Sequence, residues 1–295
     1  MSDNDLKDLI GKKIFFVNPT PTIRNYVISA LRDEELEVYI LDRHALLKSV
    51  LIKNPGSIVF IHLDSGLSLN GWLVYLQDIT NDPDFGDLTV GVISDKITEK
   101  EKIWLTGNAK IGGGFHKSSI SPTKLTENIL DIVMNLKAKG RRQFVRANCY
   151  EDQGNVLIWN QDNILMQLKL VDISTSSTAV QLPVKYKELV KENLSVKGAT
   201  LKLGQKQYIV DFMVYGIHER ANKILMVAIF KKDTIRVLKN DFQTFIYSIL
   251  QKQLMQSIEL LAPDEKEYSK IGKTLKLAPA PDQGAKKKSD NEKKS

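Results

Sequence analysis

The chain has 295 residues, enough for two ordinary domains, and its contents of 42% hydrophobic and 26% charged residues are typical of a globular protein. The formal net charge is +7, but the segment from Asp264 to Ser295 holds nine lysines and six acidic residues, which contribute +3 of that charge. The charge that remains is too small to indicate a polyanion-binding protein such as a nucleic-acid binder.

The first half of the chain alternates short apolar strands with amphipathic helices, after a charged stretch over residues 1–10 that we expect to be a tail. Apolar runs that alternate with helices are typical of a parallel sheet covered on both faces. We therefore predict a doubly wound α/β domain over residues 11–138, with Gly140 ending its last helix in the left-handed conformation. The expected strands are 14–17, 36–41, 57–63, 88–94 and 113–116, and the expected helices are 22–35, 44–54, 70–79, 96–108 and 121–139.

The period then changes, and residues 149–260 are rich in strand-like segments separated by turn residues. Five or six short strands in this length favour a small antiparallel β-barrel with a C-terminal helix. An apolar stripe that includes Phe242 and Ile246 should pack that helix on the barrel. Residues 261–295 are rich in Lys, Pro and Ser, and we expect a disordered tail. The expected strands are 155–160, 165–173, 177–182, 198–204, 207–217 and 223–230, and the expected helices are 184–193 and 242–261.

Several classes of protein are disfavoured by the sequence. The longest apolar runs are far too short to cross a membrane, and the charged N-terminus lacks the apolar core of a signal peptide. The single cysteine, Cys149, rules out an internal disulfide framework and fits a reducing cytoplasm. The four histidines have no metal-ligand spacing, and Cys149 has no evident base, so we expect neither an enzyme nor a bound cofactor or metal.

The five βα units over residues 11–138 resemble the receiver domain of response regulators. An active receiver has an acidic pair after its first strand, which binds magnesium, and a phosphorylated aspartate at the end of its third strand. Here the first strand ends in Asn18 and Pro19, which supply no carboxylate for magnesium. His62 stands at the acceptor position, and Asp64 follows two residues later. The resemblance therefore implies a pseudo-receiver that lacks the phosphorylation chemistry.

Two other receiver positions are retained, since Ser94 matches the hydroxyl residue after the fourth strand and Lys117 matches the lysine after the fifth. Two alternatives remain open, namely Asp64 as the acceptor or phosphorylation of His62. We favour a third interpretation, in which hydrogen bonds simply hold His62 at the strand end. The run of glycines at 112–114 fails the P-loop spacing and indicates a tight turn before the last strand.

Three arginines lie in the segment KGRRQFVRANC, residues 139–149, which joins the two expected domains. We assign residues 139–148 to a linker. Arg142 and Arg146 are four residues apart, so they share a side in a strand or in a helical turn, and Arg141 is adjacent. On its own, this pattern is most simply a charged linker. Guanidinium groups placed this way are also suited to bind phosphates, to hydrogen-bond guanine and to stack on bases.

A second motif lies at VDISTSSTAV, residues 171–180, where Asp172 and Ser174 share one face of an extended segment. A carboxylate is the natural acceptor for the N1 and N2 donors of guanine. The alternation of Leu168 and Leu170 would point Asp172 inward, so we expect the strand to end or bulge there and present Asp172 at the surface. Alone, the motif would be no more than a turn.

Together, the two motifs resemble the PilZ domain, which binds cyclic di-GMP through Arg-x-x-x-Arg followed by Asp or Asn-x-Ser-x-x-Gly. The resemblance covers residues 139–255 and implies a nucleotide site. One position departs from the pattern, because a serine stands where glycine is expected. The implied cyclic di-GMP site consists of Arg141, Arg142, Arg146, Asp172, Ser174 and, at the glycine position, Ser177.

The leading expectation is a non-catalytic cyclic di-GMP effector. Nucleotide binding would order the interdomain linker, change the arrangement of the domains and alter the binding of an unidentified protein partner through the receiver-like domain. The alternative is a nucleotide-independent adaptor with two degenerate domains, which Ser177 and the missing receiver carboxylates favour. A nucleic-acid partner is disfavoured because the sequence lacks an aromatic stacking array.

Overall fold

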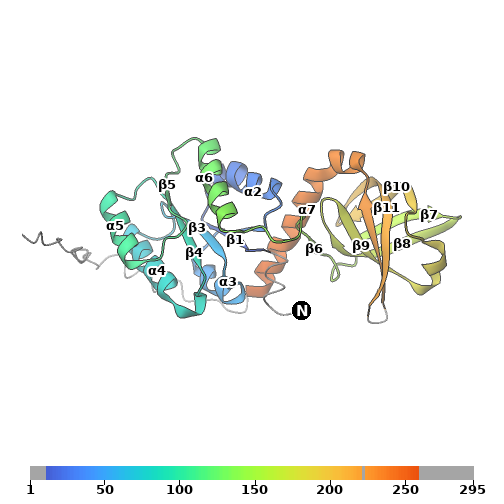
Figure 1. Cartoon of the computed structure of the whole chain (residues 1–295), viewed down its shortest axis with the longest axis horizontal. Helices are drawn as coiled ribbons and strands as arrows, with labels where there is room; N and C mark the ends of the chain where they lie inside the picture. The colour runs from blue at the N-terminus through green and yellow to red at the C-terminus, as the bar shows by residue number, and fades with distance from the viewer. Residues whose placement is uncertain (1–10, 221–222, 259–295) are drawn as a thin grey trace, which may run out of the picture.

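The computed structural model describes residues 11–220 and 223–258. Figure 1 shows an α/β unit, a β-barrel and a long helix, α7, that runs between them. The predicted tails at residues 1–10 and 261–295, and the last residues of the expected C-terminal helix, lie outside the described residues. Along the two described ranges, no helix has both the length and the apolar character needed to cross a bilayer.

The first unit is built on an all-parallel sheet with the strand order β2-β1-β3-β4-β5, which confirms the predicted doubly wound fold. Every residue of β1 and β3 is buried, because helices cover both faces of the sheet. The strands are β1 (Ile14–Val17), β2 (Val38–Leu41), β3 (Ile58–His62), β4 (Thr89–Ile93) and β5 (Phe115–His116).

The helices of this unit lie on two faces of the sheet. Phe15 and Val17 of β1 point to one apolar cluster, and Ile14 and Phe16 point to the other, as the period of two in a strand requires. The helical segments are the π-helical η1 (Ile23–Ile28), α2 (Ser29–Asp33), the short η2 (His44–Leu46), α3 (Leu47–Lys53), α4 (Leu69–Asn81), the short η3 (Pro83–Phe85), α5 (Glu99–Asn108) and α6 (Pro122–Asn135).

The end of α6 differs from the sequence prediction. Lys137, with φ 53°, takes the left-handed conformation, whereas Gly140 does not, so the prediction for Gly140 was wrong. The helix ends early because the Ala138 N–H bonds back to the Val133 carbonyl at 3.0 Å and the Lys137 N–H to the Met134 carbonyl at 2.9 Å.

The glycines before β5 lie where the chain passes close to β4. A Cβ on Gly113 would lie 2.8 Å from the Gly91 backbone, and Gly114 has φ 73°. This agrees with the tight turn predicted from the sequence.

The second unit is a closed antiparallel barrel of six strands in the order β8-β7-β10-β11-β12-β9, with β9 pairing back to β8. Alternate side chains fill its interior, among them Leu168, Leu170, Val210 and Phe212. The strands are β7 (Val156–Gln161), β8 (Ile164–Ile173), β9 (Ser177–Leu182), β10 (Ser195–Leu203), β11 (Lys206–Arg220) and β12 (Lys223–Phe230).

Two features of this unit were not foreseen. A two-residue strand, β6 (Ala147–Asn148), pairs with the end of β8. The helix expected over 184–193 is the 3₁₀-helix η4 (Val184–Leu189) instead of an α-helix. Val190 is already extended, and β10 begins at Ser195, so the chain has no length for a longer helix here.

Helix α7 (Lys232–Ile258) has 27 residues and begins before the expected start at residue 242. Phe242 and Ile246 lie in the barrel core, as the apolar stripe predicted. The C-terminal part of the helix packs on the other unit, since Leu254 and Ile258 lie in an apolar cluster of the α/β unit. Leu250 packs against both clusters.

A row of polar side chains on α7 also bonds to the backbone of the α/β unit. Gln243 Nε2 donates to the Arg32 carbonyl at 3.1 Å, and Tyr247 Oη donates to the Leu36 carbonyl at 2.7 Å. Gln251 satisfies both backbone groups of Ile40, donating to its carbonyl at 2.8 Å and accepting from its N–H at 3.0 Å. The spacing of four residues puts these side chains on one face of the helix. The helix therefore fixes one unit against the other.

We expect Leu254→Ala to destabilise the protein by about 2–5 kcal/mol, because it leaves a cavity at the contact between α7 and the α/β unit. Chemical denaturation measures the change in the free energy of unfolding. Gln256→Ala, at an exposed position on the same helix, is the matched control and should change it by less than about 0.5 kcal/mol. Equal stability of the two variants would show that Leu254 does not hold the units together.

Candidate functional site

The arginine segment, residues 140–146, is a loop with both ends fixed. Before it, Lys139 forms a β-bridge with Gly11. After it, β6 pairs with β8 in a register that sets Asn148 opposite Asp172. This short pairing brings the two sequence motifs together.

The charged side chains of the two motifs form an ion pair, in which Arg146 Nη1 lies 3.7 Å from Asp172 Oδ1. That distance is too long for a hydrogen bond, and Asp172 Oδ1 is buried and accepts none from the described residues. Burial raises the pKa of the Asp172 carboxyl, while Arg146 and Arg142 oppose that shift. The site thus holds a carboxylate with unused acceptor capacity beside two guanidinium groups.

A β-bulge presents Asp172 to this site. The register between β8 and β9 shifts between Leu170, which faces Val180, and Asp172, which faces Ala179. Leu168 and Leu170 are fully buried, and without the shift Asp172 would follow them into the barrel. The bulge predicted from the sequence is confirmed, but Asp172 is only partly at the surface, with 29% of its side chain exposed.

Ser174 lies inside the turn that follows β8. Its side chain is fully buried, and Oγ accepts from the N–H groups of Ser176 at 3.3 Å and Ser177 at 3.0 Å. The hydroxyl therefore shapes the turn next to Asp172. Its contact with a ligand remains a prediction.

Ser177, at the expected glycine position, begins β9 and has no left-handed backbone conformation. Its Oγ lies 3.0 Å from Ser174 Oγ. The local backbone therefore does not require glycine here. What Ser177 does to a ligand is still to be tested.

A small cavity of about 40 Å³ lies between the arginine segment and the α/β unit. Arg141, Arg142 and Arg146 are all exposed. Arg142 and Arg146 line the cavity together with Glu35 and Glu37, which lie in the connection between α2 and β2. Neither glutamate could be predicted, because Glu35 is 110 residues from Val145 in the chain and belongs to no recognisable motif.

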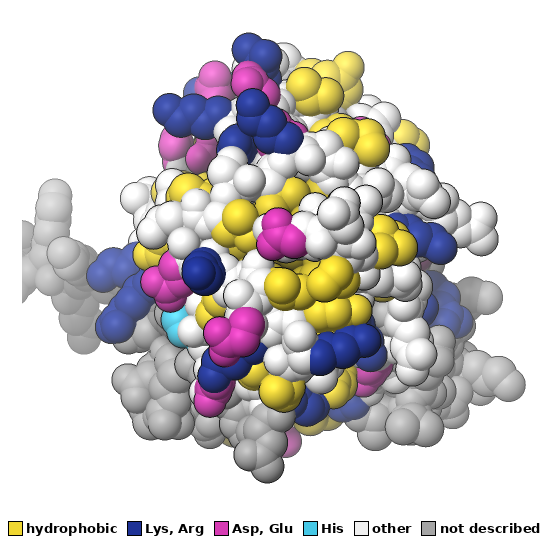
Figure 2. All heavy atoms as spheres, turned by 90° about the vertical axis from the view of Figure 1, so that its right-hand side faces the viewer, with side chains coloured by type: hydrophobic (Ala, Val, Ile, Leu, Met, Phe, Trp, Pro, Cys, Tyr) yellow, Lys and Arg dark blue, Asp and Glu magenta, His cyan; other side chains and the backbone are white. Residues whose placement is uncertain are grey.

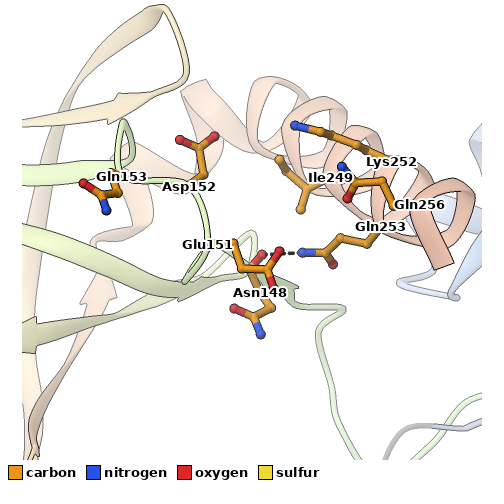
Figure 3. A pocket seen from close by; sticks show the side chains of 8 residues that line it. All are labelled: Asn148, Glu151, Asp152, Gln153, Ile249, Lys252, Gln253 and Gln256. Carbon is orange, nitrogen blue, oxygen red and sulfur yellow. Dashed lines mark hydrogen bonds between the residues drawn. The ribbon is translucent and has the colours of Figure 1, made fainter.

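A larger cavity of about 400 Å³ lies between α7 and the chain that follows β6 (Figure 3). Gln253 Nε2 donates to the Asn148 carbonyl at 2.8 Å across its edge, as the figure shows. This bond joins α7 to the residue two positions after Arg146. The helix that ties the units together therefore also holds one end of the arginine segment.

In the α/β unit, His62, Asp64 and Ser94 of the receiver positions lie at the carboxyl ends of β3 and β4. Asp64 accepts from the Ser94 hydroxyl and from the Asp95 N–H at 3.0 Å. Lys96 Nζ donates to the Asp64 carbonyl at 3.3 Å. Lys117, at the position of the receiver lysine, is exposed. The Asp64 carboxylate is thus engaged in local hydrogen bonds at the end of the strand.

His62 is buried at the end of β3, with Nε2 3.9 Å from Asp64 Oδ2. Burial lowers the pKa of its imidazole, and the nearby carboxylates of Asp64 and Asp95 oppose this shift. The ring is therefore biased toward its neutral form. The other reactive side chain singled out in the sequence, Cys149, is buried as well, and burial raises its thiol pKa to about 12.

Asp172→Asn should leave the ligand-free protein at least as stable as the wild type at pH 7, because it removes a charge whose burial is unfavourable. A raised pKa means that the folded state binds more protons than the unfolded state, so the wild type loses stability as the pH rises above the ordinary value of 3.8. The advantage of the variant should shrink toward pH 4. Thermal unfolding at several pH values measures this, with Glu151→Gln as an exposed control. A less stable variant at pH 7 would show that attraction to the arginines outweighs burial.

His62 should titrate below its ordinary value of 6.5 in an NMR pH titration, with His62→Gln identifying its resonance. Because the pKa of His62 is lowered in the folded state, burial of the neutral ring contributes stability that is fully present above pH 6.5. This contribution is lost as the pH falls through the folded pKa. A midpoint above 6.5 would mean that the carboxylates of Asp64 and Asp95 outweigh burial.

No protein-family model matches the chain, and no curated protein matches it. Among solved structures, YcgR of Escherichia coli in complex with c-di-GMP is similar at 16% identity and a TM-score of 0.35, over 41% of this chain and 51% of YcgR. The PilZ domain of YcgR with c-di-GMP is similar at 16% identity and a TM-score of 0.36, over 40% of this chain and 98% of that domain. The response regulator CheY4 of Vibrio cholerae is similar at 15% identity and a TM-score of 0.33, over 43% of this chain and 98% of CheY4. The match thus spans about half the length of YcgR.

Proposed function

We propose that the protein is a non-catalytic effector that binds cyclic di-GMP between the arginine segment and the turn after β8. The observation that carries this proposal is the pairing of β6 with β8, which places Arg-x-x-x-Arg beside Asp172. Residues 11–138 form the receiver-like domain in this proposal, residues 139–148 the linker, and residues 149–260 the barrel with its helix.

The residue types suit the two chemical groups of the ligand. Arg142 and Arg146, with Arg141 as an auxiliary contact, donate to phosphate oxygens or to guanine O6 and N7. Asp172 accepts from the N1 and N2 donors of guanine, which would satisfy the oxygen that has no hydrogen bond in the structure. Ser174 and Ser177 hold the turn that positions Asp172.

In the same proposal, nucleotide binding regulates the contact between the two units. The arginine segment starts at the α/β unit and ends at the barrel, so its ordering around a nucleotide changes how the two units contact each other. In this mechanism a protein partner in the cytoplasm binds the receiver-like unit, and its binding depends on how the two units contact each other. The local hydrogen bonds of Asp64 fit a unit that serves for contact and not for phosphorylation.

Isothermal titration of cyclic di-GMP into the full chain tests the proposal. The wild type should bind with measurable heat, and Arg142→Ala and Arg146→Ala should each weaken affinity by about ten- to a hundredfold, since a charged hydrogen bond contributes about 1.5–3 kcal/mol. Arg236→Ala is the matched control, because Arg236 is an exposed arginine of α7 that pairs with Asp233 of its own helix at 3.1 Å.

Absence of heat and of thermal stabilisation at saturating nucleotide would overturn the ligand assignment. The nucleotide-independent adaptor would then be the better account. A partner retained through the barrel with and without nucleotide would support it.

A further inference from the structure

Glu35 connects the α/β unit directly to the candidate nucleotide site. It lies in the turn between α2 and β2, with φ 57°. One carboxylate oxygen, Oε2, accepts from the Val145 N–H at 3.0 Å, and the other, Oε1, accepts from the Thr175 hydroxyl at 2.8 Å. Val145 directly precedes Arg146, and Thr175 directly follows Ser174. A single side chain thus bonds to both halves of the site.

The backbone around Glu35 is held on either side. The Glu34 carbonyl accepts from Lys139 Nζ at 3.0 Å, and the Leu36 carbonyl accepts from Tyr247 Oη at 2.7 Å. The first bond comes from the residue before the arginine segment and the second from α7. These two bonds fix the turn, so the carboxylate of Glu35 is presented to Val145 and Thr175 with little freedom to move away.

The charge of Glu35 is of the same sign as that of the proposed ligand. Glu35 and Glu37 line the same small cavity as Arg142 and Arg146. Phosphate groups drawn to these arginines are repelled by the two carboxylates at short range. Movement of Arg146 toward a ligand would also pull on Val145, whose N–H is bonded to Glu35.

We propose that Glu35 is a latch that holds the arginine segment against the α/β unit and competes with cyclic di-GMP. This inference rests on the proposed function. Nucleotide binding releases Val145 and Thr175 from Glu35, and the arginine segment is then free to move away from the α/β unit. Because coupling between two sites is reciprocal, whatever weakens the latch strengthens nucleotide binding by the same factor.

Calorimetric titration of cyclic di-GMP into matched variants of the full chain tests the latch. Glu35→Ala should bind about tenfold more tightly than the wild type. Glu34→Ala removes the same charge from the neighbouring exposed position and should bind like the wild type within about twofold. Thr175→Val keeps the side-chain shape but removes the hydroxyl, and it should also tighten binding. The double variant should bind no more tightly than Glu35→Ala alone, because both changes break one contact.

Amide hydrogen exchange without nucleotide supplies a second measurement. The Val145 amide should exchange faster in Glu35→Ala than in the wild type and Glu34→Ala. If Glu35→Ala does not fold, the affinity of Thr175→Val for cyclic di-GMP is compared with that of the wild type instead.

The outcomes separate the latch from the proposed function. If the wild type binds cyclic di-GMP and Glu35→Ala binds equally or more weakly, the latch is wrong and the effector function stands. If the wild type binds cyclic di-GMP and Glu35→Ala binds about tenfold more tightly, the latch and the effector function are both supported. If none of the variants binds, the proposed function and the latch are both overturned.

Discussion

Helix α7 contributes side chains to two hydrophobic cores, and this shared burial determines where the α/β unit lies relative to the barrel. Phe242 and Ile246 belong to the barrel core, whereas Leu254 and Ile258 belong to the core of the other unit. Since neither part of the helix can leave its core without exposing apolar surface, the helix links the two folds energetically. The position of the arginine segment follows, because its two ends belong to the two units that α7 holds together.

The candidate site contains one carboxylate whose burial is unfavourable and one whose hydrogen bonds are satisfied. Asp172 is a partly buried carboxylate whose nearest cation lies at 3.7 Å, beyond hydrogen-bonding distance. Such a group is unfavourable in the unliganded fold and becomes favourable only when a ligand supplies the missing donors. In the same region Glu35 satisfies an amide and a hydroxyl that belong to the two halves of the site. One carboxylate oxygen therefore lacks a hydrogen-bond donor among the described residues, whereas both oxygens of the other carboxylate accept hydrogen bonds.

Much of the fold could be predicted from local patterns. The periods of apolar residues give both the parallel sheet and the barrel, and the conflict between Leu170 and Asp172 in one alternation predicts the bulge. The contacts between the units could not be predicted, since Glu35 and Val145, or Gln251 and Ile40, are far apart in sequence and carry no distinctive spacing. The buried position of Ser174 was also missed, because a serine in a turn has the same sequence signature whether its hydroxyl faces a ligand or the backbone.

The bonds between Gln251 and Ile40 have a consequence for self-association. Strand β2 is at one edge of the parallel sheet, where unpaired backbone groups would be able to accept a strand from another molecule. Gln251 occupies both backbone groups of Ile40, and Tyr247 occupies the carbonyl of Leu36 just before the strand. The opposite edge is β5, which is only two residues long. The helix that joins the two units thus also blocks the longer edge of the sheet, and association of copies through sheet extension has little backbone left to use on this unit.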